Sequence, residues 1–232
     1  MMIIEARDLA KTYRGGDGAL IHVLDGVDLQ VRRGEMVAIV GASGAGKSTL
    51  LHVLGALDRP NRGSVLLAGE PLHGRTDQEL AAIRNRKIGF VFQFHHLLRE
   101  FSALENVMMP LRIAGVDIRQ ARSRAEELLS RVGLSGRMTH RPSELSGGEQ
   151  QRTAVARALA LDPAVVLADE PSGNLDHANS ERLHELFSHL ASDFEISMVV
   201  VTHNRSLASR ADRALLLEDG RLRETDVKEV VA

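Results

Sequence analysis

A phosphate-binding loop is the first feature of the sequence that could do chemistry. The segment GASGAGKST, residues 41–49, has the spacing G-x-x-x-x-G-K-[ST] and directly follows the apolar run MVAIV. Glycines let several backbone N–H groups of such a loop point at one anion. Lys47 can reach the β- and γ-phosphates of a nucleotide, and the hydroxyl of Ser48 can bind Mg²⁺. The alternative, a glycine-rich turn that matches by chance, is disfavoured by the strand–loop–helix context. We therefore predict that a nucleotide is bound by Gly41, Ala42, Ser43, Gly44, Ala45, Gly46, Lys47, Ser48 and Thr49.

Two acidic residues end a second apolar run, VVLADE, at residues 165–170. Asp169 ends the predicted strand, where it can hold Mg²⁺ through water. Glu170 follows, where its carboxylate can accept a proton from an attacking water molecule. The alternative is a pair of solvated acids at the end of a strand. The presence of the phosphate loop in the same chain favours the catalytic interpretation.

A second candidate anion site lies in ELSGGEQQRTAVARALALDP, residues 144–163. The two glycines after Ser146 open a predicted helix, and a hydroxyl with free N–H groups at a helix start can bind an anion. One chain with two phosphate-binding loops and one carboxylate pair is unusual. It makes sense if the two loops meet across a dimer.

These motifs and their order resemble the ATP-binding-cassette (ABC) ATPases, over residues 3 to about 225. LSGGEQ is similar to the signature of that family, NLD at 174–176 to its D-loop, and Gln93 and His203 to its Q-loop and switch residues. The resemblance implies that Tyr13 stacks on adenine and that Gln93 senses the γ-phosphate and the membrane partner. It implies catalytic roles for Lys47, Gln93, Glu170 and His203. It further implies that Ser48, Gln93 and Asp169 bind Mg²⁺. ATP contacts are implied for Ser146, Gly147, Gly148, Glu149 and Asp176. The LSGGE residues would make their contacts with the ATP of the other subunit in a head-to-tail homodimer.

Three further segments resemble one branch of the family, the lipoprotein-releasing LolD-type ATPases. They are FQFHHLL (92–98), ALENVMMPL (103–111) and EPSGNLD (170–176). The resemblance implies integral-membrane transporter subunits as partners and release of lipoproteins from the inner membrane. It also implies a peripheral position on the cytoplasmic face of that membrane. A macrolide or peptide exporter cassette and a cell-division-associated cassette are the alternatives. A chromosome-repair ATPase is disfavoured, since no long coiled coil separates the phosphate loop from the signature.

The elements that must position these residues indicate an α/β fold. MVAIV (36–40), VVLAD (165–169) and MVVV (198–201) are continuous apolar runs, typical of parallel strands buried on both faces. The run at 21–31 alternates like a half-buried antiparallel strand. Helices are predicted at 117–133, with Ile118 on the buried face, and at 103–115, interrupted or capped near Pro110. We predict one nucleotide-binding domain, 1–232, with a parallel-sheet core, an antiparallel β subdomain and a helical subdomain inserted at about 94–162.

Composition limits the classes of function. The 232 residues carry a net charge of −2 and contain no cysteine. No broad basic field points to nucleic acid, and thiolate metal sites are excluded. The N-terminal residues do not form a signal peptide. The apolar runs are far shorter than the roughly 20 residues that a membrane span needs, so we expect membrane contact only through a partner.

The segment FHHLL after Gln93 admits three interpretations. Adjacent histidines on an extended segment point in different directions, so they chelate a metal poorly, and no dedicated metal site is expected among the histidines. Packing of Phe94, Leu97 and Leu98 within the helical insertion is the second interpretation. The third is a partly exposed apolar surface that receives the membrane partner.

Overall fold

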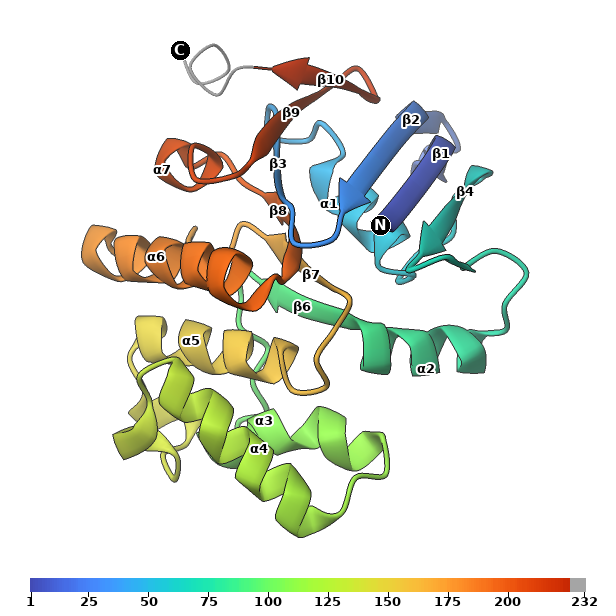
Figure 1. Ribbon diagram of the computed structural model, residues 1–232. Coiled ribbons are helices and arrows are strands. Elements are labelled where there is room, and N and C mark those ends of the chain that lie inside the picture. Colours follow the sequence, from blue (N-terminus) through green and yellow to red (C-terminus); the bar gives the residue numbers. More distant parts are fainter. Residues whose placement is uncertain (226–232) are drawn as a thin grey trace.

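The computed structural model describes residues 1–225, so residues 226–232 of the predicted domain lie outside the described part. A six-stranded sheet in the order β10-β9-β3-β8-β7-β6 forms the centre of the fold (Figure 1). Its strands are β3 (Met36–Val40), β6 (Ile88–Phe92), β7 (Val165–Asp169), β8 (Ser197–Val201), β9 (Arg213–Glu218) and β10 (Arg221–Thr225).

The first five strands of this sheet in chain order run parallel, and β10 alone pairs antiparallel. Every residue of β3 and β8 is buried, as the continuous apolar runs predicted. Between β9 and β10 the chain turns at Asp219 and Gly220, both with positive φ, which suits a tight hairpin.

A second, antiparallel sheet has the order β2-β1-β4-β5. Its strands are β1 (Met2–Arg14), β2 (Leu20–Arg32), β4 (Arg62–Leu67) and β5 (Glu70–Pro71). The alternating run at 21–31 lies within β2, which confirms the antiparallel prediction. Helix α1 (Lys47–Leu54) contacts strands of both sheets, and its leucines join one apolar core with them.

Most of the remaining helices lie on the other face of the central sheet, whereas Leu80 and Ile83, from the helix at residues 77–87, join the same apolar core as α1. The remaining helices are α2 (Asp77–Lys87), α3 (Ala103–Ile113), α4 (Ile118–Arg131), α5 (Gly147–Ala158), α6 (His177–Phe194), α7 (Arg205–Ala208) and the 3₁₀ turns η1 (Ser135–Arg137) and η2 (Pro142–Glu144). A second apolar cluster joins α3, α4, α5 and α6 to β6, β7 and β8 (Figure 1). Within residues 1–225, no helix is long and apolar enough to cross a membrane.

Two details of the predicted helices were wrong. Helix α3 continues past Pro110 to Ile113, because Val107 and Leu111 are buried on either side of the proline and hold both halves against the core. Ile118 is 57% exposed, since it is the first residue of α4 and lies beyond the packed stretch that begins at Ala121.

Candidate functional site

The predicted catalytic residues gather at the carboxyl ends of the parallel strands. The phosphate loop follows β3, and Asp169 ends β7 in register with Phe92 of β6 and Val201 of β8. Gln93 therefore follows β6 beside Asp169, and His203 lies just beyond β8. Ligands of open α/β sheets bind at this edge, because the strand-to-helix turns converge there.

The phosphate loop presents backbone N–H groups and one ammonium group. Gly46 caps α1 with φ of 98°, and the helix start has no side-chain cap, so its first N–H groups are free to bind an anion. Gly41 has φ of 152°, and a Cβ there would lie 2.4 Å from the Leu217 carbonyl oxygen, so only glycine fits. Nζ of Lys47 donates to the carbonyl oxygens of Gly41 and Ala42, both at 2.8 Å, which holds the buried cation inside the loop.

Asp169 and Ser48 form a site suited to a hard divalent cation. Burial raises the pKa of Asp169, and a hydrogen bond from Ser48 offsets part of that effect. Oδ1 of Asp169 is buried and has no hydrogen-bond partner among the described residues. A buried carboxylate oxygen without a partner, next to a hydroxyl group, is the donor set that Mg²⁺ prefers. The residues present therefore fit a magnesium ion.

Glu170 and His203 face one another. Nδ1 of His203 lies 2.9 Å from Oε1 of Glu170, and the His203 backbone N–H donates to Oε2 at 3.3 Å. Glu170 has φ of 44°, a left-handed conformation that costs free energy in a residue other than glycine. Its backbone N–H donates to the Val201 carbonyl oxygen at 2.9 Å, which ties the strained residue to β8. The carboxylate is thus held at the edge of the sheet with one histidine to orient it.

Gln93 hydrogen-bonds a residue to which the sequence analysis gave no role of its own. Its Nε2 donates to Oδ1 of Asn174 at 2.9 Å, and Nδ2 of Asn174 donates to the Gln93 carbonyl oxygen at 3.2 Å. Asn174 lies in EPSGNLD and begins NLD, the segment similar to the D-loop, and these two motifs were the signals that pointed to this part of the chain. The two reciprocal hydrogen bonds connect the segment after β6 to the segment after Glu170.

Tyr13 lies near the phosphate loop at the end of β1. Its hydroxyl donates to Oδ2 of Asp58 at 2.7 Å, and Nζ of Lys11 lies 4.9 Å from the ring centroid. Burial and the Asp58 hydrogen bond raise the pKa of Tyr13, while a hydrogen bond with Thr49 of α1 lowers it. The side chain is 37% exposed. A partly exposed ring beside α1 can stack on a nucleobase.

The LSGGE residues form a tightly capped helix start. Ser146 caps α5, its Oγ accepting from the Glu149 N–H, while Oε2 of Glu149 accepts from the Ser146 N–H at 2.8 Å. These backbone bonds and the Arg137 guanidinium lower the pKa of Glu149 to about 2. Both Glu149 oxygens are therefore engaged within the chain.

The residues around Gly148 and Asp176 pack against one another. A Cβ on Gly148 would lie 2.4 Å from Oδ1 of Asn179. Asn179 in turn donates through its backbone and its side chain to Asp176, which caps α6. The signature and the D-loop thus form one packed unit in which both carboxylate oxygens of Asp176 accept hydrogen bonds.

The segment after Gln93 is fixed to α5 and α3 by side chains to which the sequence analysis assigned no role. Arg157 donates to the carbonyl oxygens of His95 and His96 at 2.8 and 2.7 Å, and Gln151 donates to that of Phe92. Buried Asn106 bonds the backbone of Leu98 at both N–H and carbonyl. Among the described residues no cluster of three or more potential metal-ligating side chains occurs.

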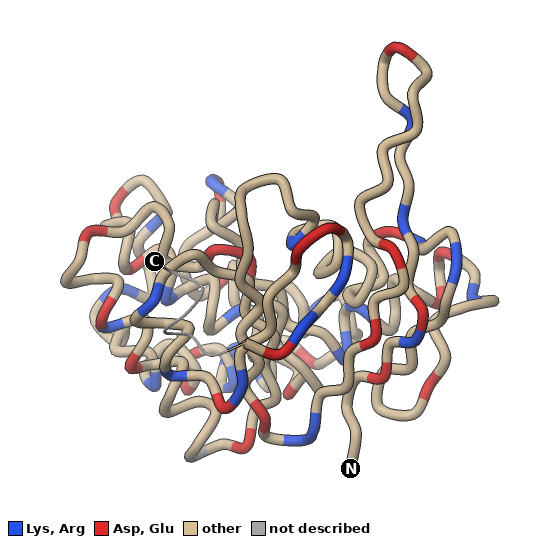
Figure 2. Tube along the Cα trace, turned by 90° about the horizontal axis from the view of Figure 1, so that it is seen from above, with Lys and Arg blue, Asp and Glu red and all other residues tan. Residues whose placement is uncertain are grey.

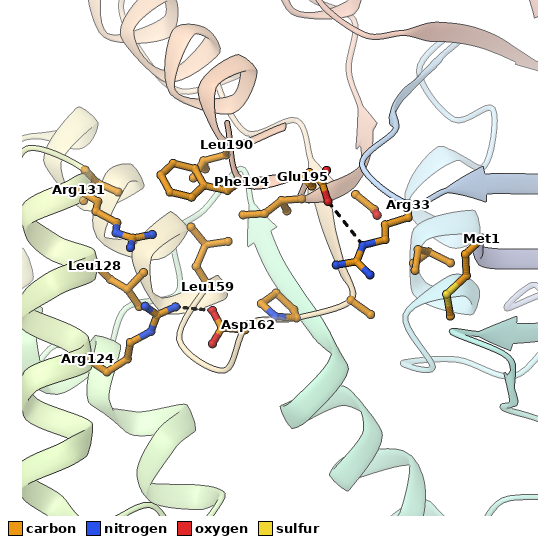
Figure 3. Close-up of a pocket in the computed structure, with 16 residues that line it drawn as sticks. Met1, Arg33, Arg124, Leu128, Arg131, Leu159, Asp162, Leu190, Phe194 and Glu195 are labelled. Atoms are coloured by element: carbon orange, nitrogen blue, oxygen red, sulfur yellow. Dashed lines mark hydrogen bonds and ion pairs between the residues drawn. The ribbon is translucent and has the colours of Figure 1, made fainter. Parts of the chain in front are cut away.

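A hollow of about 380 Å³ lies apart from these residues, between α4, the end of α6 and the N-terminus (Figure 3). Arg124 pairs with Asp162 there, and Arg33 lies 3.9 Å from Glu195. Since acidic neighbours already face these guanidinium groups, the hollow offers little net charge to a ligand. Basic and acidic residues are also interspersed along the described chain (Figure 2).

Comparisons with known proteins agree with this geometry. Residues 24–173 match the ABC transporter family model. The chain is 54% identical to the "Lipoprotein-releasing system ATP-binding protein LolD" of Geobacter metallireducens, over 95% of this chain and 97% of that protein. It is 55% identical to the protein of the same name from Xanthomonas campestris pv. campestris, over 96% and 92%.

Solved structures are similar over almost the whole chain. The "Dimeric Structure of MJ0796, a Bacterial ABC Transporter Cassette" has a TM-score of 0.88 and 40% identity, covering 97% of this chain and 98% of that one. The same cassette in a dimeric post-hydrolysis state bound to ADP and Pi has a TM-score of 0.88 and 39% identity, with the same coverage. CbiO1 from Clostridium perfringens has a TM-score of 0.85 and 27% identity, covering 99% and 90%.

Proposed function

The chain belongs to the ABC transporter family of ATPases, and from this premise we propose that it drives the release of lipoproteins from the inner membrane. It binds and hydrolyses ATP, as members of this family do. The observation that carries the lipoprotein assignment is the identity of 54–55%, over nearly full length, to proteins named as ATP-binding subunits of lipoprotein-releasing systems.

We assign separate roles in ATP hydrolysis to the phosphate loop, Glu170 and His203. The N–H groups of residues 41–49 and Nζ of Lys47 bind and orient the β- and γ-phosphates. Glu170 accepts a proton from the attacking water as the water oxygen bonds the γ-phosphorus and the bond to the β-phosphate oxygen breaks. His203 holds the Glu170 carboxylate at 2.9 Å, which keeps the base directed into the site.

We assign Mg²⁺ to Ser48 and Asp169, with Gln93 as a further ligand. The unpartnered Oδ1 of Asp169 supports the first two assignments. In this structure Gln93 bonds Asn174 instead, so its assignment requires its amide to turn. Bound Mg²⁺ supplies positive charge that stabilises the charge developing on the phosphates. Tyr13 is assigned to adenine, because its ring is partly exposed beside α1.

ATP binding is proposed to join two copies of the chain head to tail. Ser146, Gly147 and Gly148 of one copy would then face the phosphates bound by the other, with Glu149 fixing the helix start and Asp176 lying at the same interface. The N–H groups of Gly147 and Gly148 at the start of α5, which the Ser146 hydroxyl does not bind, support this arrangement. The dimeric structures of a similar cassette support it as well.

The helical subdomain, at about residues 94–162, is the proposed receiver of integral-membrane subunits. Phe94 is 65% exposed, and Leu98 and Phe101 are exposed beside it. A nearby hollow of about 400 Å³ is lined in part by Leu57 and Ile113. Exposed apolar side chains on a segment adjoining Gln93 suit a helix of a membrane protein and place it next to the active site.

The direct test is ATP hydrolysis by the chain alone and by the chain reconstituted with its candidate membrane subunits. We expect the complex to hydrolyse ATP faster than the chain, and Phe94→Ala to remove most of that increase while basal hydrolysis persists. Phe194→Ala, which changes an exposed phenylalanine beside the separate 380 Å³ hollow, is the matched control and should leave the increase intact. An unchanged rate upon reconstitution of the wild type would contradict the proposed partner.

A further inference from the structure

A buried histidine on α6 contacts the loop that carries Glu170. His184 is 0% exposed, and its Nε2 lies 3.0 Å from Oγ of Ser172. Ser172 is two residues after Glu170 and is 6% exposed. Burying an imidazole costs free energy unless its polar atoms are satisfied, so this contact has a structural or functional reason.

The direction of this hydrogen bond follows from the charge on the other side of the ring. Oε1 of Glu181, one turn earlier on α6, lies 3.4 Å from Nδ1 of His184, a charge contact without hydrogen-bond geometry. A carboxylate at that distance favours the tautomer with the proton on Nδ1, because a lone pair there would face a negative charge. Burial lowers the pKa of His184, so the ring is neutral near pH 7. Nε2 is then an acceptor, and the Ser172 hydroxyl donates to it.

Glu181 also holds the segment that follows His203. Its Oε1 accepts from Oγ of Ser206 at 2.7 Å, and its Oε2 accepts from Arg210 at 2.8 Å. Ser206 lies in α7, which begins two residues after His203. Glu181 and His184 on α6 therefore contact two segments. His184 contacts the turn that begins at Glu170, and Glu181 contacts the segment that follows His203.

On this side the turn that carries Glu170 borders an open space, although Pro171 and Ser172 are themselves buried. A polar hollow of about 340 Å³ lies between α6, α7 and the loop, lined in part by Glu170, Ser172, Glu181 and His203. Within the loop, the Gly173 N–H bonds the Glu170 carbonyl oxygen, and the Leu175 N–H bonds that of Ser172. Two side chains of α6 bond this turn. The Ser180 hydroxyl reaches the carbonyl oxygens of Ser172 and Leu175 only at 3.5 Å, so the 3.0 Å contact of His184 with Ser172 is the shorter link, and Glu170 at the start of the turn keeps a φ of 44°.

We infer that His184 is a positioning residue for Glu170, acting through Ser172 and oriented by Glu181. This inference rests on the proposed role of Glu170 as the base. Loss of the bond lets the Glu170 turn relax toward the hollow, which moves the carboxylate away from the attacking water. A displacement of this kind lowers the rate of the chemical step while the phosphate loop continues to bind ATP.

The test compares Ser172→Ala, His184→Phe and His184→Gln with the wild type in the ATPase assay. We expect Ser172→Ala and His184→Phe to lower kcat about tenfold, with KM for ATP within about twofold of wild type. His184→Gln retains an acceptor at the same reach and should recover kcat to within about threefold of wild type. Ser188→Ala is the matched control, because its Oγ donates only to the His184 carbonyl oxygen within α6.

The outcomes separate this inference from the assignment of Glu170. If Glu170→Gln abolishes turnover while Ser172→Ala keeps the wild-type kcat, His184 has no positioning role. If Glu170→Gln itself turns over normally, the assignment of the base fails first. The kcat of His184→Phe is interpreted only if this variant has the Tm of the wild type. If its Tm is lower, the test rests on Ser172→Ala, which removes a single oxygen atom. Equal loss in Gln and Phe variants would also overturn the inference.

Discussion

Replacing Gly148 by alanine should lower both stability and turnover through a contact inside the chain. The new Cβ would lie 2.4 Å from Oδ1 and 2.7 Å from Cγ of Asn179, so Asn179 must move. Asn179 donates to Asp176 through its N–H at 2.9 Å and through Nδ2 at 2.7 Å. Displacement of its side chain therefore breaks the Nδ2 bond to Asp176, the capping residue of α6, while the backbone N–H bond remains, and the Asp176 carboxylate in the D-loop is free to shift.

The magnitude follows from these contacts. Forcing an extra methyl group into a packed contact costs about 1–3 kcal/mol. The free energy of unfolding should thus fall by about 1–3 kcal/mol, which lowers Tm by roughly 2–12 °C in a chain of this size. Gly147→Ala should change stability little, because the nearest atom to its Cβ is Cδ2 of Leu175 at 3.7 Å.

A double-mutant cycle measured by thermal unfolding and by ATPase assay tests this reasoning. Asn179→Ala removes the clashing atoms, so Gly148→Ala combined with Asn179→Ala should match Asn179→Ala alone in Tm and kcat. Additive losses of stability would refute the steric argument. If the double variant regains stability but does not hydrolyse ATP, the Cβ added at position 148 would instead interfere with the phosphates bound by the second copy in the proposed dimer.

Four further outcomes are expected. Glu170→Gln should lower steady-state ATP turnover at least about 100-fold and accumulate an ATP-bound dimer in gel filtration; near-normal turnover would remove Glu170 as the base. Tyr13→Ala should raise KM for ATP roughly tenfold, from about 1–3 kcal/mol of lost stacking, whereas Tyr13→Phe should stay near wild type; equal effects would exclude stacking. The folded pKa of Glu149 is lowered from 4.5 to about 2, so its contribution to stability is present above pH 4.5 and is lost as pH falls toward 2. Glu149→Gln should therefore reduce the loss of stability between pH 4.5 and pH 2. An unchanged slope of stability against pH in that range would contradict the lowered pKa. His95→Ala should reduce partner-stimulated hydrolysis more than basal hydrolysis, because Nε2 of His95 lies 3.2 Å from the Gly147 carbonyl oxygen and connects the exposed segment to the signature; equal loss of both would indicate a packing role.

The phosphate loop and the carboxylate pair could be located from sequence because each follows an uninterrupted apolar strand. Parallel strands bring their carboxyl ends to one edge, so the motifs after β3 and β7 had to meet. The buried runs therefore predicted both the central sheet and the position of Ser48 relative to Asp169.

The supporting side chains could not be found in the same way. Arg157 and His184 lie in ordinary helical sequence, and their partners His95 and Ser172 belong to other segments, so no local spacing marks them. Asn106 is fully buried, yet its role depends on the path of a loop that precedes α3. Pro110 was misleading, because tertiary packing of α3 outweighed the local cost of a proline in the helix.

Release of an acylated lipoprotein from membranes tests the central claim most directly. The chain and its membrane subunits would be reconstituted in vesicles loaded with a lipoprotein, and release into the soluble fraction followed with and without ATP. The account predicts release that requires ATP and is lost in the Glu170→Gln variant. ATP hydrolysis by the complex without any release would contradict the lipoprotein function while leaving the ATPase itself intact.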